Sequence, residues 1–339
     1  MANLCTGCES NYFDFLQKHH RNNEASLTFL RSHGVLPTEV YCPRCKVLCN
    51  YREDTHQWYC GSWKKIAKTK RRKQCYFSVS DYRGTFLAGT PLAPYKILSF
   101  VNHWLSKRWD YQTVMDCLGI SEGTGASWQK YCAEVTEHWL DTQKPIGGPE
   151  VVVDIDETLF GKLKYEKGKT FSQIWVFGGI ERTSKKFFVV PLGEPLNQNL
   201  IPLIQKHILP GSVIVSNRWS AYSTISDHGY IHQVINHSGD LLDEENAEAH
   251  TKNIELLWHD VKEWRLKPGN RPQLYKQYLA RTLFLQQHTF KDIHHHFFCE
   301  VARMYPPQFD EREKLTPPNQ VKEDKEEPDN PEGLSEEKD

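Results

Sequence analysis

The sequence predicts an α/β protein whose main domain is a mixed β-sheet covered by helices. Three observations support this prediction. Residues 150–300 alternate between apolar runs of strand length and segments with helical periodicity. Residues 41–77 concentrate cysteine and aromatic side chains, which is typical of a small metal-binding module. Residues 94–140, between these regions, have a helical pattern throughout.

This order divides the chain of 339 residues into five parts. We expect a helical lead-in over residues 1–38, a zinc-ribbon-like module over 39–90 and a helical segment over 92–145. The α/β domain should follow over residues 150–303. Residues 306–339 are rich in proline and charge and contain almost no apolar side chains, so we expect them to be disordered.

The composition, with 39% hydrophobic and 25% charged residues, is ordinary for a soluble globular protein. No apolar run approaches 18 residues, so we expect no membrane-spanning helix. The N-terminal residues lack the basic flank and apolar core of a secretory signal. The ten cysteines therefore indicate metal binding or free thiols in a reducing compartment rather than disulfides.

The net charge of −1 conceals an uneven distribution. Residues 310–339 hold twelve acidic and five basic residues, a net charge of −7, which leaves +6 on the rest of the chain. An acidic tail on a basic body suits a protein that binds nucleic acid.

A zinc site is predicted from the cysteines of residues 41–77. Cys42 and Cys45 form a CxxC knuckle, and Cys60 and Cys75 could complete a tetrahedral set of thiolates. The fourteen residues between Cys60 and Cys75 make an unusually wide second pair. Other possible ligands are Cys49, His56 and a second CxxC pair, Cys5 and Cys8. The alternative is that all of these are ordinary free cysteines.

A basic run, KKIAKTKRRK at residues 64–73, fills most of this wide spacing. Its seven basic residues are Lys64, Lys65, Lys68, Lys70, Arg71, Arg72 and Lys73. We expect the run to contact DNA phosphates or to serve as a nuclear localisation signal. A solvated loop is the alternative.

Residues 111–139 have the pattern of a helix-turn-helix. A short helix ends near Leu118, Gly119 permits a tight turn, and Ser121 is a good N-cap for a second helix. That second helix would enter the major groove of DNA. Gly123 and Gly125 each weaken it by about 1 kcal/mol relative to alanine. The alternative is a plain helical bundle that links two domains.

The order of elements over residues 150–300 is ribonuclease-H-like. Strands are expected at 151–156, 173–180, 185–191, 212–216 and 231–235. Helices are expected at 196–208, 219–225, 250–265 and 272–300. We interpret the histidine run at 294–296, near the end of the last helix, as an exposed polar run rather than a metal site.

Three polar residues follow this order of strands and helices. Asp156 lies near the end of the alternating run VVVDIDE, Asn217 ends the strand VIVSN, and Glu255 lies in the first turns of the helix NIELLW. Carboxylates that converge in this way can hold two metal ions for phosphoryl transfer. The alternatives are a turn or cap role for Asp156 and a helix-surface charge for Glu255.

Several segments together resemble the Merlin-type DDE transposases and their bacterial insertion-sequence relatives. They are VDIDETLFGKLKY, QIWVFGGIER, PLIQKHILPGSVIVS, WSAY, VINHS and AHTKNIELLWHDVK, and they occur in the family's order over about 150–290. The resemblance implies a ribonuclease-H-like fold that uses Mg²⁺ to cleave and join DNA at terminal inverted repeats. It also implies self-association. The CPRC knuckle and the helical segment resemble the family's zinc ribbon and helix-turn-helix.

Within this resemblance, the first catalytic Asp falls on Asp156 and the catalytic Glu on Glu255, whereas Asn217 stands in place of the second Asp. Asparagine offers an amide oxygen but no charge, and Mg²⁺ prefers anionic oxygens. Losing a direct ligand should cost more than the roughly 10–100-fold of an outer-shell change. We therefore hypothesise a domesticated, nuclear DNA-binding protein with weak or absent strand transfer. An active transposase and a protein-interaction scaffold are the alternatives.

Overall fold

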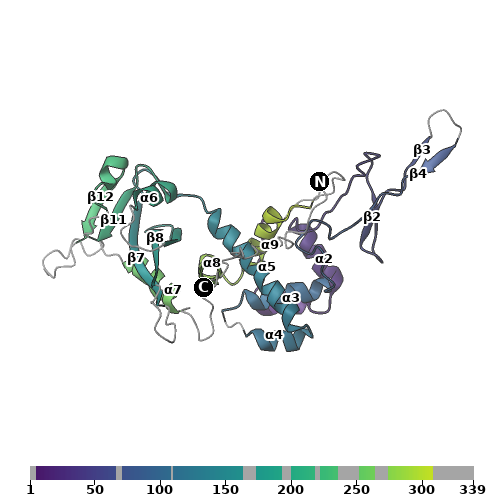
Figure 1. Cartoon of the computed structure of the whole chain (residues 1–339), viewed down its shortest axis with the longest axis horizontal. Helices are drawn as coiled ribbons and strands as arrows, with labels where there is room; N and C mark the ends of the chain where they lie inside the picture. The colour runs from purple at the N-terminus through teal and green to yellow at the C-terminus, as the bar shows by residue number, and fades with distance from the viewer. Residues whose placement is uncertain are drawn as a thin grey trace, which may run out of the picture.

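The computed structural model has a mixed α/β architecture with three parts, which lie next to one another in Figure 1. The structure describes residues 5–65, 71–107, 110–162, 173–192, 200–217, 222–235, 252–263 and 274–307. A β-sheet domain occupies one end, a body of helices the middle, and a small cysteine-containing module the other end. The predicted disordered tail lies almost wholly outside the described residues. Within the described part of the chain, no helix is long and apolar enough to cross a membrane.

The lead-in consists of two helices, α1 (Tyr12–His19) and α2 (Asn23–Ser32). The side chain of Asn22 accepts a hydrogen bond from the amide of Ala25 and so caps α2. Arg21 adopts a left-handed conformation, φ 54°, which turns the chain between the two helices. After α2, Gly34 takes φ 73°, a conformation that glycine adopts without strain.

The cysteine-containing module is built on two small antiparallel sheets. β1 (Asn50–Arg52), β2 (Gln57–Tyr59) and β5 (Ser78–Ser80) form the first sheet, and β3 (Trp63–Lys65) and β4 (Arg72–Gln74) form the second. The module has its own core: Val40, Cys42, Cys49, Trp58, Cys60, Phe77 and Val79. At its base, the buried carboxylate of Asp81 accepts hydrogen bonds from Trp58 and from Arg31 of α2, which joins the module to the helices.

The helical body contains α3 (Pro94–Trp104), α4 (Tyr111–Leu118) and α5 (Glu122–Asp141). Two helices that follow the sheet domain in the sequence, α8 (Tyr275–Gln287) and α9 (Ile293–Met304), pack against α5 and share its apolar core. The single helix expected over residues 272–300 is therefore wrong. Residues 288–292 interrupt it, and the chain reverses there to lay α9 beside α5.

The main sheet has the strand order β12-β11-β7-β8-β9. β7 (Val152–Lys162), β8 (Gln173–Glu181) and β9 (Phe187–Leu192) pair antiparallel in this order, whereas β11 (Val213–Asn217) pairs parallel with β7, and β12 (Ile231–Ile235) pairs parallel with β11. Strands expected at all five positions are present. β7 is longer than predicted, because it continues past residue 156 in its pairing with β8.

The two faces of this sheet carry different helices. Val153 and Ile155 of β7 pack beneath α6 (Ile201–His207) on one face. Asp154 and Asp156 alternate with them and belong to the other face, where α7 (Lys252–Glu263) lies. The described residues also include a short parallel pair, β6 (Ile146–Gly147) and β10 (Ile208–Leu209), and a 3₁₀ turn, η2 (Ile225–His228).

Candidate functional site

Asp156 lies in the middle of β7 rather than at an exposed strand end, which corrects the sequence-based expectation. The parallel pairing of β7 with β11 ends where Asp154 meets Val215, although both strands continue. Asp156 and Asn217 therefore lie two residues beyond the last paired position, where the strands begin to separate. The fold thus brings together two of the three predicted catalytic residues.

Neutral donors contact both oxygens of Asp156. The Asn217 amide Nδ2 lies 3.4 Å from Asp156 Oδ1, at the long end of hydrogen bonding. The indole Nε1 of Trp258, from α7, donates to Asp156 Oδ2 at 3.0 Å. Gly178 stands opposite Asp156 on β8, and a Cβ at this position would lie 2.6 Å from Cη2 of Trp258. Glycine at 178 therefore makes room for the indole ring.

Burial raises the pKa of the Asp156 carboxyl. The hydrogen bond from Trp258 opposes this shift, whereas the nearby charge of Glu255 adds to it. Burial likewise raises the pKa of Glu157, against the effect of hydrogen bonds from Tyr222 and Asn217. The site thus holds two carboxyls whose charged forms are disfavoured by the loss of water.

The acidic residues on either side of Asp156 have partners of their own. Asp154 is fully buried and accepts from Arg182, with Oδ1–Nε and Oδ1–Nη2 distances of 2.9 Å and 2.8 Å. Glu157 accepts a short hydrogen bond from the hydroxyl of the buried Tyr222. Removing one partner of such a buried pair is destabilising, so both residues help to fix the strand.

Glu255 occupies the first turn of α7 and has an exposed side chain. The negative charge of Glu255 contributes to the raised pKa of Asp156. Among the described residues, however, neither Glu255 nor Asp156 belongs to any group of three His, Cys, Asp or Glu ligands within 4.8 Å of one another. The Oδ1 atom of Asn217 is buried and has no hydrogen-bond partner among the described residues.

These side chains do not fit a two-magnesium site. Such a site needs several anionic oxygens around the ions. Here Asp156 already accepts hydrogen bonds at both oxygens, Asn217 is neutral, and Glu255 stands on the exposed side of its helix. The buried Oδ1 of Asn217 has no hydrogen-bond partner among the described residues.

The four predicted zinc ligands come together. The Sγ atoms of Cys42, Cys45, Cys60 and Cys75 lie within 4.8 Å of one another and could hold a zinc ion. Cys42 Sγ is 3.7 Å from Cys75 Sγ, and the amide of Cys45 donates to Cys42 Sγ at 3.4 Å. All ten cysteines are free thiols in the structure.

The alternative zinc ligands lie outside this cluster. Cys49 is buried in the same small core but is not among the four, and His56 contacts the hydroxyl of Tyr51. Cys5 and Cys8 belong to a separate group with two histidines. The pairing of the two CxxC motifs in one site, which the sequence left open, is therefore wrong.

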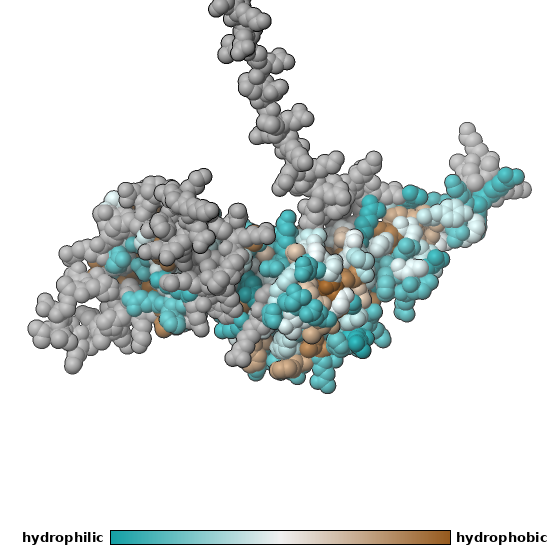
Figure 2. All heavy atoms as spheres, turned by 60° about the horizontal axis from the view of Figure 1, so that its bottom comes forward, coloured by the Kyte–Doolittle hydropathy of each residue, from teal (hydrophilic) through white to brown (hydrophobic). Residues whose placement is uncertain are grey.

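The two ends of the basic run lie on β3 and β4, an antiparallel hairpin pair that projects from the module in Figure 1. Basic residues face one another across it: Lys64 pairs with Lys73, and Lys65 with Arg72. Lys64 Nζ donates to the carbonyl of Arg44 at 2.6 Å. Lys68 and Lys70 lie outside the described residues. In Figure 2 the described side chains near the outer end of this hairpin are hydrophilic.

The short turn between α4 and α5 has the predicted capping. Gly119 takes φ 57°, and Ser121 Oγ accepts from the amide of Thr124 at 3.3 Å. We expected Gly125 to weaken the second helix relative to alanine. This expectation needs correction, because a Cβ at position 125 would lie 2.0 Å from Met115 Sδ. Glycine at 125 permits close approach of α4, whereas Gly123 has open space around it.

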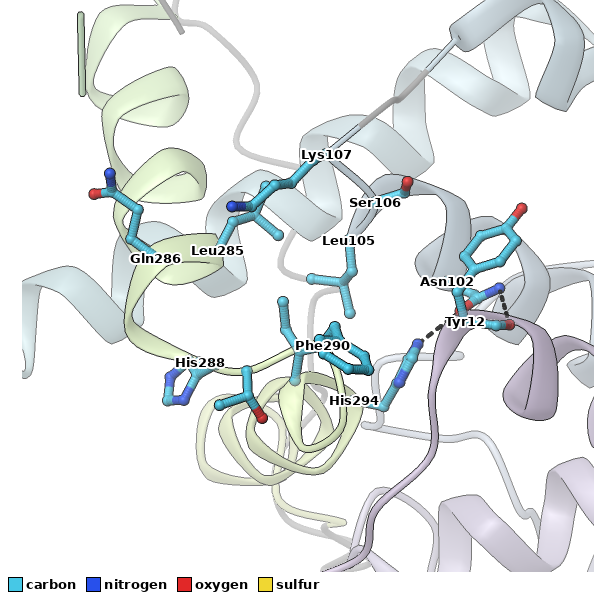
Figure 3. A pocket seen from close by; sticks show the side chains of 12 residues that line it. Tyr12, Asn102, Leu105, Ser106, Lys107, Leu285, Gln286, His288, Phe290 and His294 are labelled. Atoms are coloured by element: carbon cyan, nitrogen blue, oxygen red, sulfur yellow. Dashed lines mark hydrogen bonds between the residues drawn. The ribbon is translucent and has the colours of Figure 1, made fainter. Parts of the chain in front are cut away.

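The histidine run at 294–296 begins α9 and is not an exposed polar run. His294 is buried, stacks on Phe15 with ring centroids 3.9 Å apart, and contacts Asn102 Oδ1 through Nε2 at 2.7 Å. It borders a pocket of about 620 Å³ in the helical body, in which Figure 3 displays the bond to Asn102. Among the described residues no carboxylate lines this pocket, and Asp156 does not border it.

Three residues that position the carboxylates of β7 were not predicted from the sequence. Trp258 and Tyr222 each contact a carboxylate of β7, and Gly178 makes room for Trp258. One signal was available: Trp258 follows Glu255 by three residues, so a helix places the two near each other. Nothing in the sequence pattern indicated that the indole would reach Asp156 while Glu255 stays exposed.

Comparison with known proteins gives two similarities. The profile of the ISXO2-like transposase domain matches residues 144–284, which include β7, β11, α7 and most of α8. Male abnormal protein mab-31 of Caenorhabditis elegans is 25% identical over 223 residues, 60% of this chain and 50% of that protein. The chain therefore spans about half the length of this relative. Residues 144–284 are thus similar to a transposase domain.

Proposed function

We propose that this protein is a transposase-derived DNA-binding protein whose ribonuclease-H-like domain has lost all or most strand-transfer activity. The main observation behind this proposal is that Asn217, at the position of the second catalytic Asp, donates a hydrogen bond to Asp156. The fold assignment is supported by the strand order, with three antiparallel strands followed by two parallel ones. The motif order supports a Merlin-type origin within the ISXO2-like group.

The electrostatics explain how the site is stable without metal. Two carboxylates at about 4 Å repel by about 4 kcal/mol at an effective dielectric constant of about 20, and bound cations normally offset this repulsion. With asparagine at 217, an amide faces the carboxylate instead. Trp258 supplies a second neutral donor. The site thus needs no cation to hold Asp156 in place.

The β3–β4 hairpin is the proposed DNA-binding element. Like charges directly across a hairpin destabilise it, so the facing pairs Lys64–Lys73 and Lys65–Arg72 favour an anionic partner. A two-stranded ribbon fits the major groove of DNA. Two largely exposed aromatic residues, Trp63 and Tyr76, stand at its base, where they add apolar contact area.

The proposed zinc site would fix both ends of this hairpin. Cys60 precedes β3 and Cys75 follows β4, so both ends of the ribbon start at proposed zinc ligands. The unusually wide spacing of this cysteine pair is explained by the ribbon that it encloses. The α4–α5 pair is a second proposed DNA contact, as a helix-turn-helix. Self-association and a nuclear location follow from the family relationship as further proposals.

The test is a cleavage and strand-transfer assay with the natural protein and Asn217→Asp side by side, in Mg²⁺ and in Mn²⁺. The DNA substrates carry terminal repeats of related elements, and DNA binding is measured in parallel by titration at several salt concentrations. We expect binding by both proteins and no strand transfer by the natural one. Strand transfer by the natural protein at a rate close to that of Asn217→Asp would overturn the proposal.

That result would favour the second candidate function, an active transposase in which Asn217 is a tolerated ligand. The buried, unpartnered Oδ1 of Asn217 is the observation in its favour. Absence of DNA binding at low salt, with the protein folded and zinc-loaded, would instead leave a protein-interaction scaffold.

A further inference from the structure

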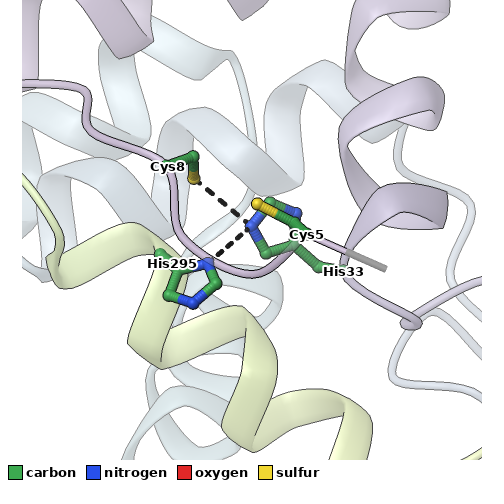
Figure 4. Close-up of side chains that lie close together, drawn as sticks. All are labelled: Cys5, Cys8, His33 and His295. Atoms are coloured by element: carbon green, nitrogen blue, oxygen red, sulfur yellow. Dashed lines mark hydrogen bonds between the residues drawn. The ribbon is translucent and has the colours of Figure 1, made fainter. Parts of the chain in front are cut away.

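A second group of four ligand side chains lies where the N-terminal segment meets the helical body. It consists of Cys5 and Cys8 of the first CxxC motif, His33 at the end of α2, and His295 in the first turn of α9. One ligand atom from each lies within 4.8 Å of the other three. Figure 4 displays the four side chains turned toward a common centre.

The distances match the edges of a zinc tetrahedron. His33 Nε2 lies 3.4 Å from Cys8 Sγ and 3.3 Å from His295 Nδ1. Zinc bonds of about 2.0–2.3 Å require ligand atoms to be separated by about 3.3–3.8 Å. Two thiols and two imidazoles are one of the usual ligand sets of structural zinc sites.

The surroundings of His33 orient it as a ligand. The ring is buried, and its Nδ1 lies 2.8 Å from the carbonyl oxygen of Phe29, one turn earlier in α2. A hydrogen bond from Nδ1 to a carbonyl fixes the tautomer that leaves Nε2 free to bind a metal, and metal-bound histidines usually have such a partner. The Nε2 atom is the one that points at Cys8 and His295.

The backbone holds the CxxC motif in place on both sides. The amide of Cys5 donates to the carbonyl of Ser32 at 2.7 Å, and the amide of Ser10 donates to the carbonyl of Lys291 at 2.7 Å. The N-terminal segment therefore bridges the end of α2 and the turn before α9. A cavity of about 590 Å³, bordered by Cys5, Cys8 and His33, gives a metal ion access.

We propose that Cys5, Cys8, His33 and His295 bind a second structural zinc ion, distinct from the four-cysteine site. This ion joins the N-terminal segment, α2 and α9, although His295 lies 262 positions after His33 in the sequence. Only eight residues separate His33 from Cys42, so the second zinc also anchors the cysteine-containing module to the helical body. The proposal does not depend on DNA binding or catalysis.

The experiment measures zinc per chain by native mass spectrometry on the full-length protein, purified under reducing conditions. The natural protein should carry two zinc ions. Cys8→Ser and His295→Asn should each carry one, Cys45→Ser should carry one, and Cys8→Ser combined with Cys45→Ser should carry none. Two matched controls should keep two ions: Cys299→Ser, whose Sγ lies 3.7 Å from His295 Nε2, and Cys117→Ser, an exposed thiol.

X-ray absorption at the zinc edge of the natural protein provides a readout that needs no variant. With both sites filled, the average zinc should have three sulfur and one nitrogen ligands, against four sulfur ligands for the four-cysteine site alone. One zinc per chain with four sulfur ligands would overturn the proposal. Two zinc ions that persist in Cys8→Ser and in His295→Asn would overturn it as well, because the second ion would then lie elsewhere.

Discussion

The indole Nε1 of Trp258 donates to Asp156 Oδ2 at 3.0 Å, from a helix that begins 96 residues after Asp156 in the sequence. This contact joins α7 to the sheet at the candidate site. Together with the amide of Asn217 on the other oxygen, it gives a buried carboxylate two neutral donors. Both donors favour the charged form of Asp156, which burial disfavours.

Asn217→Asp should make the stability of the protein depend on Mg²⁺. The substitution places a second carboxylate beside Asp156, so we expect the melting temperature to fall in Mg²⁺-free buffer and to recover as Mg²⁺ is added. The natural protein should be insensitive to Mg²⁺. Asn217→Ala, which removes the amide without adding charge, serves as the control and should gain no response to Mg²⁺. Differential scanning fluorimetry measures all three, and an equal response of all three to Mg²⁺ would contradict the prediction.

Trp258→Phe removes the indole N–H and keeps an aromatic ring. Hydrogen bonds to charged groups contribute about 1.5–3 kcal/mol, so we expect a loss of that order in the free energy of unfolding near pH 7. The loss should shrink as the solution is acidified, because a protonated Asp156 needs the donor less.

The sign follows from the pKa of Asp156. Burial raises the pKa in the folded protein, so this carboxyl lowers stability progressively as pH rises from its unfolded value through its folded one. Without the indole donor that pKa rises further, which widens the difference between variant and natural protein at higher pH. Urea unfolding of both proteins between pH 4 and pH 8 measures this difference in the free energy of unfolding. A difference that is constant with pH would mean that Trp258 acts through packing alone.

Arg72→Gln combined with Lys73→Gln should weaken DNA binding and reduce its salt dependence. Each phosphate contact adds about 0.9 to the slope of log affinity against log salt, so losing both should reduce the slope by up to about 1.8. Lys276→Gln is the control, since Lys276 pairs with Asp141 on the helical body, away from the hairpin. Fluorescence anisotropy at four or more salt concentrations gives the slopes. An unchanged slope in the double variant would exclude the hairpin as a phosphate-binding element.

Gly125→Ala and Gly123→Ala should differ in their effect on stability, although both lie in the first turn of α5. Alanine is favoured over glycine by about 1 kcal/mol in a helix, and Gly123 has open space, so Gly123→Ala should stabilise the protein. At position 125 the added methyl group would meet Met115 at 2.0 Å, and overpacking costs about 1–3 kcal/mol. Gly125→Ala should therefore be neutral to destabilising in urea unfolding. Equal stabilisation by both would mean that α4 does not pack closely on α5.

The sequence by itself determined the features that depend on short-range patterns. Alternation in VVVDIDE predicted a strand with one apolar and one acidic face, and Val153 and Ile155 are buried accordingly. The spacing of Cys42 and Cys45 predicted the knuckle, because two ligands three residues apart can bind one ion. Ser121 and Gly119 predicted the start of α5 and the end of α4 through local backbone chemistry.

Only the tertiary structure decided which distant residues meet. The pattern of residues 150–300 did not indicate that Trp258 would contact Asp156, or that His294 would be buried against Phe15. It also did not indicate that the first CxxC motif would join His33 and His295 rather than the four-cysteine cluster. Periodicity records which side of an element is apolar, whereas the partner of that side is set by how helices and strands far apart in the chain pack together.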